Sequence, residues 1–327
     1  MPLPRPVTRA DADRQSQFAQ HESWRIAVTG ATGFVGSALV PYLTAAGHRV
    51  MRVARGAVAA GSGDVHWDPA RGTLDARALD GVDAVIHLAG ESIAERWTAE
   101  RRRRILDSRV EGTALMARTL ATLVHPPRVL VSASAVGFYG NTGPTEVDEG
   151  ASAGTGFLAS VVQEWEEAAD PARAAGIRVV HPRSGVVLSP GGGALARMLL
   201  PFKLGAGGPL AGGRQWMSWI AREDLLGVLE FLLLTDSLRG PVNAVAPNPV
   251  TNAEFTRTLA SVLGRPAVTP VPAFALRLLF GEMADETLLA GQRVRPAALL
   301  AAGFPFRHPH LEEALRFELG RKQVDAA

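Results

Sequence analysis

Three glycines at three-residue spacing are the residues of this 327-residue sequence that point most directly to chemistry. The segment Gly30-Ala31-Thr32-Gly33-Phe34-Val35-Gly36 follows the apolar run 24–29 and precedes a stretch of helical character at 37–46. A helix N-terminus offers unpaired N–H groups and a positive dipole end to a phosphate, and glycine lets the backbone approach a pyrophosphate closely. The segment therefore predicts a dinucleotide site, to which Thr32, Phe34 and Val35 also belong. The alternative is a strand–turn–helix corner without a ligand.

The end of the next apolar run indicates which dinucleotide is bound. An NAD site usually has an acidic residue about 20 positions past the glycines, where it bonds the ribose 2′-OH. No acid occurs at 37–63, and Arg52 and Arg55 stand at the end of the run 49–53 instead. Because a guanidinium can hold a 2′-phosphate by charge-assisted bonds, we expect NADP(H) rather than NAD(H). Arg55 is favoured because it lies past the strand end, although both arginines could simply face solvent.

The order of the apolar runs indicates the fold. Helical patterns at 98–123 and 157–175 alternate with short apolar runs at 26–29, 49–53, 84–88, 128–132 and 177–181. Such alternation predicts an α/β Rossmann fold, a doubly wound parallel sheet. Ligands of such sheets bind beyond the carboxyl ends of the strands. Leu88, Ala89, Gly90, Pro182 and Arg183 therefore join the predicted cofactor residues.

Beyond residue 183 the sequence indicates a smaller, discontinuous C-terminal substrate domain. Loop-forming Pro and Gly clusters occur at 190–193 and 205–209. Helices are expected at 222–234, 252–263, 273–280 and 311–317. The predicted organisation is a disordered extension at 1–22, an NADP-binding domain at 23–183 with a return segment at about 217–247, a substrate domain at 184–216 and 248–318, and a tail at 319–327.

Composition narrows the function classes. No stretch reaches the roughly 18 unbroken apolar residues of a membrane span, so we expect no membrane association. Cysteine is absent, which excludes disulfides and thiolate nucleophiles and fits a cytoplasmic location. The net charge of +2 and the dilution of the basic run 101–104 by nearby acids argue against a nucleic-acid partner. The eight scattered histidines form no metal-binding pattern.

The runs 29–36, 87–90 and 132–140, in this order, resemble the extended short-chain dehydrogenase/reductase superfamily. The runs His87-Leu88-Ala89-Gly90-Glu91 and Ser108-Arg109-Val110-Glu111-Gly112-Thr113, with the tail from about 250 to 306, more narrowly resemble its atypical branch of epimerase family proteins, which carry a C-terminal domain of unknown function. The resemblance covers residues 24–317. It implies NADP(H) binding, a small-molecule substrate and a homodimer that pairs the helices near 98–123 and 157–175.

The acid–base pair of that superfamily is missing from this chain. Its members use Tyr-x-x-x-Lys on a helix, where the lysine lowers the pKa of the tyrosine so that it can exchange a proton with substrate. The two tyrosines here, Tyr42 and Tyr139, are followed four residues later by alanine and glycine. The helix expected to carry the pair offers Phe157, Val161 and Trp165 instead.

The remaining candidates each have a second interpretation. Ser134 is a catalytic candidate that can hydrogen-bond a carbonyl, or else a strand-end cap. Tyr139 is a candidate proton donor, or else a packing residue. Glu91 and Ser92 are candidates for substrate contact, or else helix caps or solvated groups. The sequence therefore predicts an oxidoreductase or epimerase-like enzyme acting on a carbonyl or sugar-type substrate. The alternative is a catalytically silent NADP(H)-sensing protein.

Overall fold

A mostly parallel sheet forms the centre of the molecule. The computed structural model describes residues 22–56 and 63–322, so most of the predicted extension and the end of the predicted tail lie outside the described residues. The strands, in spatial order, are β13 (Gly240–Ala244), β9 (Arg178–Ser184), β6 (Val129–Ser132), β5 (Ala84–His87), β1 (Arg25–Thr29), β2 (Arg49–Ala54), β3 (Val65–Asp68) and β4 (Thr73–Leu74), with β7 (Ser134–Ala135) beside β9. Neighbours pair in parallel except β3 with β4. The predicted Rossmann fold is confirmed.

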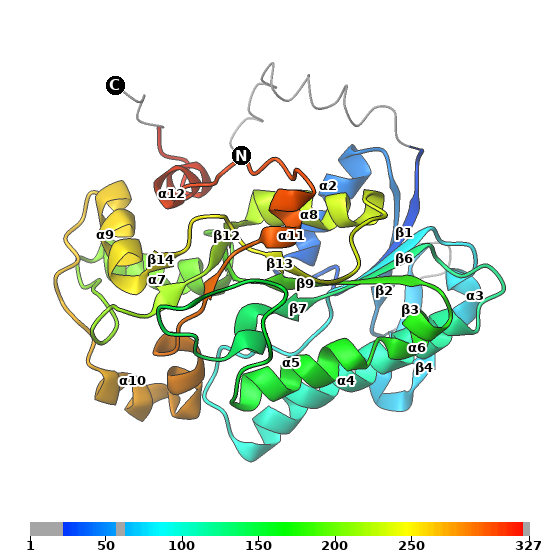
Figure 1. Cartoon of the computed structure of the whole chain (residues 1–327), viewed down its shortest axis with the longest axis horizontal. Helices are drawn as coiled ribbons and strands as arrows, with labels where there is room; N and C mark the ends of the chain where they lie inside the picture. The colour runs from blue at the N-terminus through cyan, green and yellow to red at the C-terminus, as the bar shows by residue number, and fades with distance from the viewer. Residues whose placement is uncertain (1–21, 57–62, 323–327) are drawn as a thin grey trace.

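Helices cover both faces of this sheet (Figure 1). On one face lie α2 (Gly36–Ala45), α8 (Arg222–Leu234) and α11 (Ala297–Ala301). On the other lie α3 (Ala76–Leu79), α4 (Ala99–Ala121) and α6 (Asp170–Ala174). The buried side chains of β1 alternate accordingly, because Ile26 and Val28 join the first core and Ala27 joins the second. Burial on both faces explains why the strands read as nearly continuous apolar runs.

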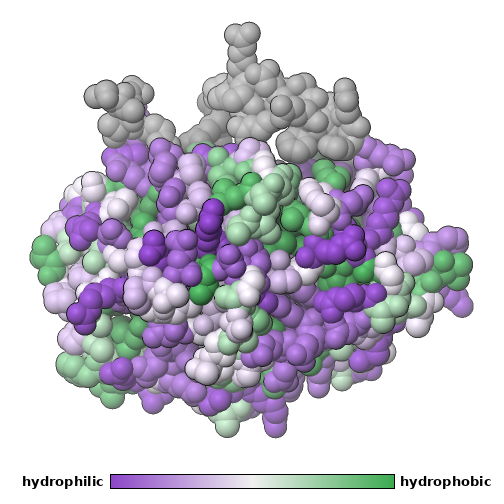
Figure 2. All heavy atoms as spheres, in the orientation of Figure 1, coloured by the Kyte–Doolittle hydropathy of each residue, from purple (hydrophilic) through white to green (hydrophobic). Residues whose placement is uncertain are grey.

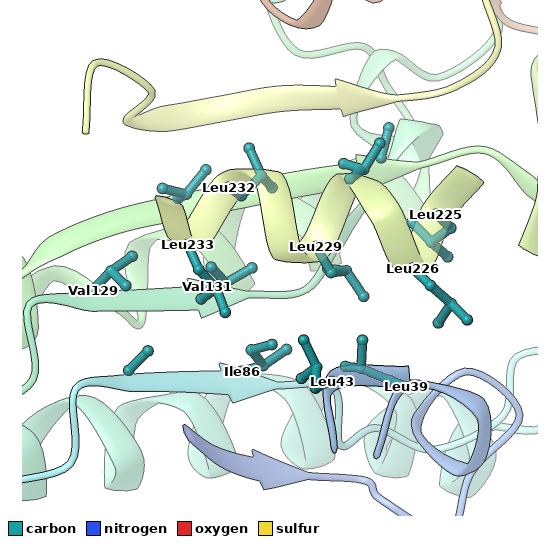
Figure 3. Packing of buried hydrophobic residues seen from close by; sticks show 14 of the residues in the cluster. Leu39, Leu43, Ile86, Val129, Val131, Leu225, Leu226, Leu229, Leu232 and Leu233 are labelled. Atoms are coloured by element: carbon teal, nitrogen blue, oxygen red, sulfur yellow. The ribbon is translucent and has the colours of Figure 1, made fainter. Parts of the chain in front are cut away.

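Helix α8 packs its leucines against the main sheet. Its leucines repeat at three- and four-residue intervals, and Figure 3 shows Leu225, Leu229 and Leu232 among the side chains packed between α8 and the sheet. Its first turn carries Glu223 and Asp224, which complement the helix dipole. After α8, strand β13 pairs with β9 and extends the main sheet. The helix has the bounds expected from the sequence.

A second group of helices packs around Trp219, Phe255 and Leu315. It comprises α7 (Gly193–Lys203), α9 (Asn252–Leu263) and α12 (Leu311–Glu318), next to the pair β10 (Val186–Leu188) and β12 (Trp219–Ala221). The Thr251 hydroxyl and the Glu254 carboxylate form a capping box at the start of α9. The remaining elements are η1 (Pro69–Arg71), η2 (Val136–Tyr139), β8 (Glu146–Val147), α5 (Phe157–Glu167), β11 (Trp216–Met217), β14 (Val250–Thr251), α10 (Ala273–Phe280), η3 (Ala284–Leu288) and β15 (Arg293–Val294).

Two helical segments differ from expectation. The pattern at 157–175 predicted one helix, but α5 ends at Glu167 and α6 begins at Asp170. Pro171 stands in the first turn of α6, where its missing N–H has no cost, whereas it would break a continuous helix. Helix α7 was not predicted, because it lies between the clusters 190–193 and 205–209, which were interpreted as loops.

The surface is mainly polar. Figure 2 shows hydrophilic side chains over most of the visible face, with smaller apolar patches between them. Within residues 22–56 and 63–322, no helix combines the length and apolar character needed to cross a membrane.

Candidate functional site

The glycine segment forms a tight turn between β1 and α2. Gly30 has φ +65°, in the left-handed region, and a Cβ there would lie 2.9 Å from the carbonyl carbon of Leu88. A Cβ at Gly36 would lie 2.1 Å from the Gly30 oxygen, so only glycine fits. At Gly33 the sole neighbour of such a Cβ is the Gly30 oxygen at 3.1 Å. The first and third glycines therefore serve close packing, while Gly33 and the adjacent Thr32 are exposed.

Thr29 holds the predicted Leu88-Ala89-Gly90 segment against this turn. Its Oγ1 accepts hydrogen bonds from the N–H groups of Leu88 at 3.0 Å and Ala89 at 3.2 Å, and lies 2.9 Å from Nδ1 of His87. Burial lowers the pKa of His87 to about 4, so this histidine is neutral at neutral pH. No role for Thr29 was predicted from the sequence, although it begins the run 29–36.

Phe34 and Val35 face the protein rather than the open side of the turn. Cβ atoms at Gly192 and Gly193 would come within 2.5 and 3.0 Å of the Phe34 ring, so this ring packs against the loop before α7. Val35 packs against the core beneath α2. These two predicted residues therefore shape the turn and connect it to the second group of helices.

The two arginines after β2 have different surroundings. Arg52 donates from Nε and Nη2 to the Asp64 carboxylate at 3.0 and 2.6 Å. Asp64 lies one residue beyond the acid-free stretch 37–63. Arg55 is exposed, and within the described ranges it forms no ion pair. The structure thus engages Arg52 and leaves the Arg55 guanidinium available.

A buried network joins the ends of β7, β9 and α5. The Ser134 hydroxyl donates to Glu166 Oε1 at 2.6 Å, and Arg183 donates to both Glu166 oxygens at 2.8 Å. Arg183 Nη1 also donates to the Tyr139 oxygen at 3.0 Å, and the Tyr139 hydroxyl donates to Asn243 at 2.7 Å. Arg183 is 3% exposed. The network therefore encloses its charges within the fold.

Ser134 and Tyr139, the two catalytic candidates predicted from the sequence, both belong to this network. Burial raises the pKa of Tyr139, an effect that Arg183 only partly opposes, so the phenol is a poor proton donor near neutral pH. Burial also raises the pKa of Glu166, but hydrogen bonds from Arg183 and Ser134 hold it below its usual value. The catalytic roles of Ser134 and Tyr139 stay predictions, as do the cofactor contacts of Arg183 and the buried Pro182.

The positions expected for the Tyr-x-x-x-Lys pair are filled by core residues. Val161 is buried beside Trp97 and Ile105. The Phe157 ring lies edge-on to Trp97 at 5.1 Å, and its backbone N–H donates to Glu286. Apolar side chains therefore stand at the α5 positions where the Tyr-x-x-x-Lys pair was expected, and the Arg102 guanidinium lies 4.4 Å from the centre of the Phe157 ring.

Helix α4 holds the two residues predicted to contact substrate. Arg101 donates to the Glu91 carboxylate at 2.7 Å and to the Ser92 carbonyl at 2.9 Å. The Glu91 N–H donates to the Ser108 hydroxyl, and the Ser92 hydroxyl accepts from Ala94. Both side chains therefore have partners within the fold, and their substrate contacts stay predictions.

One cation at this rim was missed. Arg109 on α4 donates from Nη1 to the Glu91 carbonyl at 3.0 Å, and its Cζ would lie 3.5 Å from a Cβ at Gly90. The signal was in the sequence, because Arg109 lies in the run 108–113 that carries the resemblance.

In the part of the chain that the structure describes, no group of three or more His, Asp or Glu side chains could hold a metal ion.

Comparison with known proteins confirms the resemblance. The model of the NAD dependent epimerase/dehydratase family matches residues 26–243, and that of a domain of unknown function matches 271–318. An epimerase family protein of Mycobacterium bovis is 46% identical over 297 residues, which cover 90% of this chain and 98% of that protein. Human epimerase family protein SDR39U1 is 40% identical over 298 residues, covering 89% and 98%.

A solved structure agrees with these relatives. The crystal structure of human SDR39U1 with NADPH matches with a TM-score of 0.82 and 38% identity, over 90% of this chain and 99% of that one. The matched segment 26–243 contains the glycine turn and the network around Glu166. From its sequence and its fold, the chain belongs to the NAD dependent epimerase/dehydratase family.

Proposed function

We propose that the chain binds NADP(H) at the glycine turn and acts as an oxidoreductase or epimerase-like enzyme on a small-molecule carbonyl or sugar-type substrate. The observation that carries the proposal is the start of α2, where no side chain caps the helix and no acid stands in the first turn. The Gly33 and Ser37 N–H groups donate to the Gly30 and Gly33 carbonyls. Within the described residues the N–H groups of Phe34, Val35 and Gly36 donate no hydrogen bond, so they and the helix dipole are available to a pyrophosphate beside the exposed Thr32 and Gly33. The residues present therefore fit a dinucleotide.

The preference for NADP(H) depends on Arg55. This guanidinium is exposed just past the end of β2, the strand that neighbours β1. In Rossmann folds the adenosine ribose of a dinucleotide lies at this strand end. Arg52 is less suited, because Asp64 already satisfies two of its donors. The NADPH in the human relative supports the same cofactor.

A bound nicotinamide would supply hydride transfer. The chain would orient it through the 88–90 segment, which Thr29 fixes beside the turn. His87 is held neutral beneath this segment and presents no charge to it.

A second candidate function is NADP(H) sensing without turnover. The observation that favours it is the apolar packing of Phe157 and Val161, together with the engagement of Ser134 and Tyr139 inside the fold. A sensor needs a partner whose affinity differs between cofactor states, because a ligand shifts an equilibrium only by differential affinity.

We also propose that the protein is cytoplasmic and that it forms a homodimer. Light scattering can test the homodimer.

Titration of the protein with NADPH, followed by fluorescence, tests the proposal. We expect saturable binding, and Gly33→Asp should abolish it by placing a carboxylate at the pyrophosphate. Absence of binding by the wild-type protein would overturn both candidates. If NADPH binds, a panel of carbonyl and sugar-nucleotide substrates separates them: oxidation of NADPH supports the enzyme. Binding with no turnover, and a partner that distinguishes NADP+ from NADPH, supports the sensor.

A further inference from the structure

Arg109 combines a cationic charge, a place at the rim of the site and unused donors. We propose that its guanidinium binds an anionic oxygen of a ligand, either a phosphate of the dinucleotide or a carboxylate or phosphate of the substrate. This inference rests on the proposed function, because it places that ligand in the same site. It extends the function by requiring an anion on the β5 side of the rim.

The charge of Arg109 has no carboxylate to balance it. Elsewhere on α4, Arg101, Arg102 and Arg104 each have a carboxylate oxygen within 4 Å. Within the described residues Arg109 forms no ion pair, and its hydrogen bonds there go to the carbonyls of Glu91 and Ile105. Backbone carbonyls satisfy donors without neutralising a charge.

The surroundings of Arg109 keep it charged at a cost. Burial lowers the pKa of its guanidinium to about 10, while the Glu91 carboxylate raises it, so Arg109 remains a cation at neutral pH. The Glu91 carboxylate is itself held by Arg101. The face of the guanidinium lies near Trp165, whose ring centroid is 5.0 Å from Cζ. A partly buried cation without a counter-ion is unfavourable, and a bound anion would relieve that cost.

Two donors of Arg109 are free to meet such an anion. Nε and Nη2 donate no hydrogen bond within the part of the chain that is described, and neither is among its fully buried unpaired atoms. The guanidinium lies beside the exposed Gly90, whose Cβ would be 3.5 to 3.6 Å from it. Leu88, two residues before, touches Gly30 of the glycine turn. The free edge of Arg109 thus lies at the rim that would hold the nicotinamide half of the cofactor.

Arg101 provides a matched control. It comes from the same helix and holds the same segment through Glu91 and Ser92, but Glu91 and Glu95 balance its charge. A role confined to holding this segment predicts equal effects for Arg101→Met and Arg109→Met. Anion binding predicts an effect specific to Arg109, and Arg109→Lys, which keeps the charge, should retain most of the affinity.

The experiment uses calorimetry to measure two sets of affinities. The proteins compared are the wild-type chain, Arg101→Met, Arg109→Met and Arg109→Lys. One arm titrates NADPH, and the other titrates inorganic phosphate and oxalate into protein with and without NADPH. Thermal melting confirms that each variant is folded, and Arg109→Gln, which also removes the charge, replaces Arg109→Met if the latter is not.

We expect Arg109→Met to lose about tenfold or more in one arm, as for the loss of a charge-assisted hydrogen bond. Loss in the NADPH arm assigns the anion to the cofactor. Loss of phosphate or oxalate binding with NADPH affinity unchanged assigns it to the substrate. Unchanged affinities in both arms, an equal loss in Arg101→Met, or a wild-type chain that binds none of the probes would overturn the inference. A wild-type chain that binds phosphate through Arg109 but not NADPH would instead contradict the proposed function alone.

Discussion

Arg183 donates hydrogen bonds from Nε and Nη2 to the two carboxylate oxygens of Glu166, each at 2.8 Å. The pair links β9 to α5, and both side chains are largely inaccessible, with 4% and 13% of their side-chain surfaces exposed. Ser134 and Tyr139 complete the hydrogen bonding of the pair. In this family member, therefore, Ser134 and Tyr139 hydrogen-bond to an ion pair of the fold.

Removal of one partner of this pair should destabilise the protein strongly. Glu166→Ala would leave the Arg183 guanidinium buried without a counter-ion, which typically costs about 3 kcal/mol or more. Urea denaturation should show this as a lower midpoint. Glu164→Ala changes an exposed glutamate of the same helix and should stay within about 0.5 kcal/mol of wild type. Similar midpoints for both variants would show that the ion pair contributes little.

Substitutions at two glycines of the turn should have different effects on stability and on NADPH binding. Gly36→Ala would place a Cβ 2.1 Å from the Gly30 oxygen, so it should disrupt the turn and lower the melting temperature. At Gly33 a Cβ would meet only the Gly30 oxygen, at 3.1 Å, so Gly33→Asp should lower the melting temperature much less than Gly36→Ala while NADPH binding is lost. Melting curves and NADPH titrations of the two variants separate these effects. Full NADPH affinity in Gly33→Asp would exclude the pyrophosphate from this turn.

Arg55 should set the cofactor preference. Arg55→Ala is expected to weaken NADPH binding about tenfold or more and to leave NADH binding nearly unchanged, because only NADPH carries the 2′-phosphate. Arg52→Ala is the control, since Arg52 is bonded to Asp64. Fluorescence titrations with both nucleotides measure the ratio. Equal losses for NADPH and NADH in Arg55→Ala would refute the contact with the 2′-phosphate.

Two buried histidines should make stability depend on pH. Burial lowers the pKa values of His87 and His181 from 6.5 to about 4, so below pH 6.5 the unfolded chain binds protons that the folded chain does not. Each histidine therefore contributes stability that is fully present above pH 6.5. This stability falls by about 1.4 kcal/mol per pH unit as the pH decreases toward 4.

Urea denaturation at pH 7.5, 6 and 5 checks this slope. His181→Asn should reduce the slope by about one proton, since it removes one titrating group. His310→Asn alters an exposed histidine and should leave the slope unchanged. An identical slope in wild type and His181→Asn would place the pKa of folded His181 near its unfolded value.

The sequence predicts much of the fold, because its local signals are strong. Helices α8, α9 and α10 have the expected bounds, since apolar periodicity and caps such as the Thr251–Glu254 box agree there. Helix α7 was missed because a proline and N-terminal glycines hid a helix that tertiary packing stabilises. The break between α5 and α6 was also missed, although Pro171 was its visible cause.

The candidate site divides in the same way. The glycine turn could be predicted from spacing, because the left-handed φ of Gly30 and the contact of Gly36 with the Gly30 oxygen are local, although Gly30 also packs against the distant Leu88. The partner of Ser134 could not, because Glu166 lies 32 residues away and only the fold brings them together. Asp64, which pairs with Arg52 across an interval of 12 residues, lies just beyond the acid-free stretch 37–63. The sequence also does not show that Arg109 lacks an ion pair within the described residues, because that depends on which side chains the fold brings near it.

The late pairing of β13 with β9 has a consequence for synthesis. A nascent chain that has not yet reached Gly240 carries β9 as a bare sheet edge, and without α8 the leucines of α2 lack their cover. Such an edge is prone to pair with the strands of other chains and so to aggregate. The ribosome synthesises α8 and β13 long after the glycine turn, so the edge stays uncovered during that interval. We therefore expect fragments that end near residue 190 to aggregate or to require a chaperone, even though they contain the whole glycine motif.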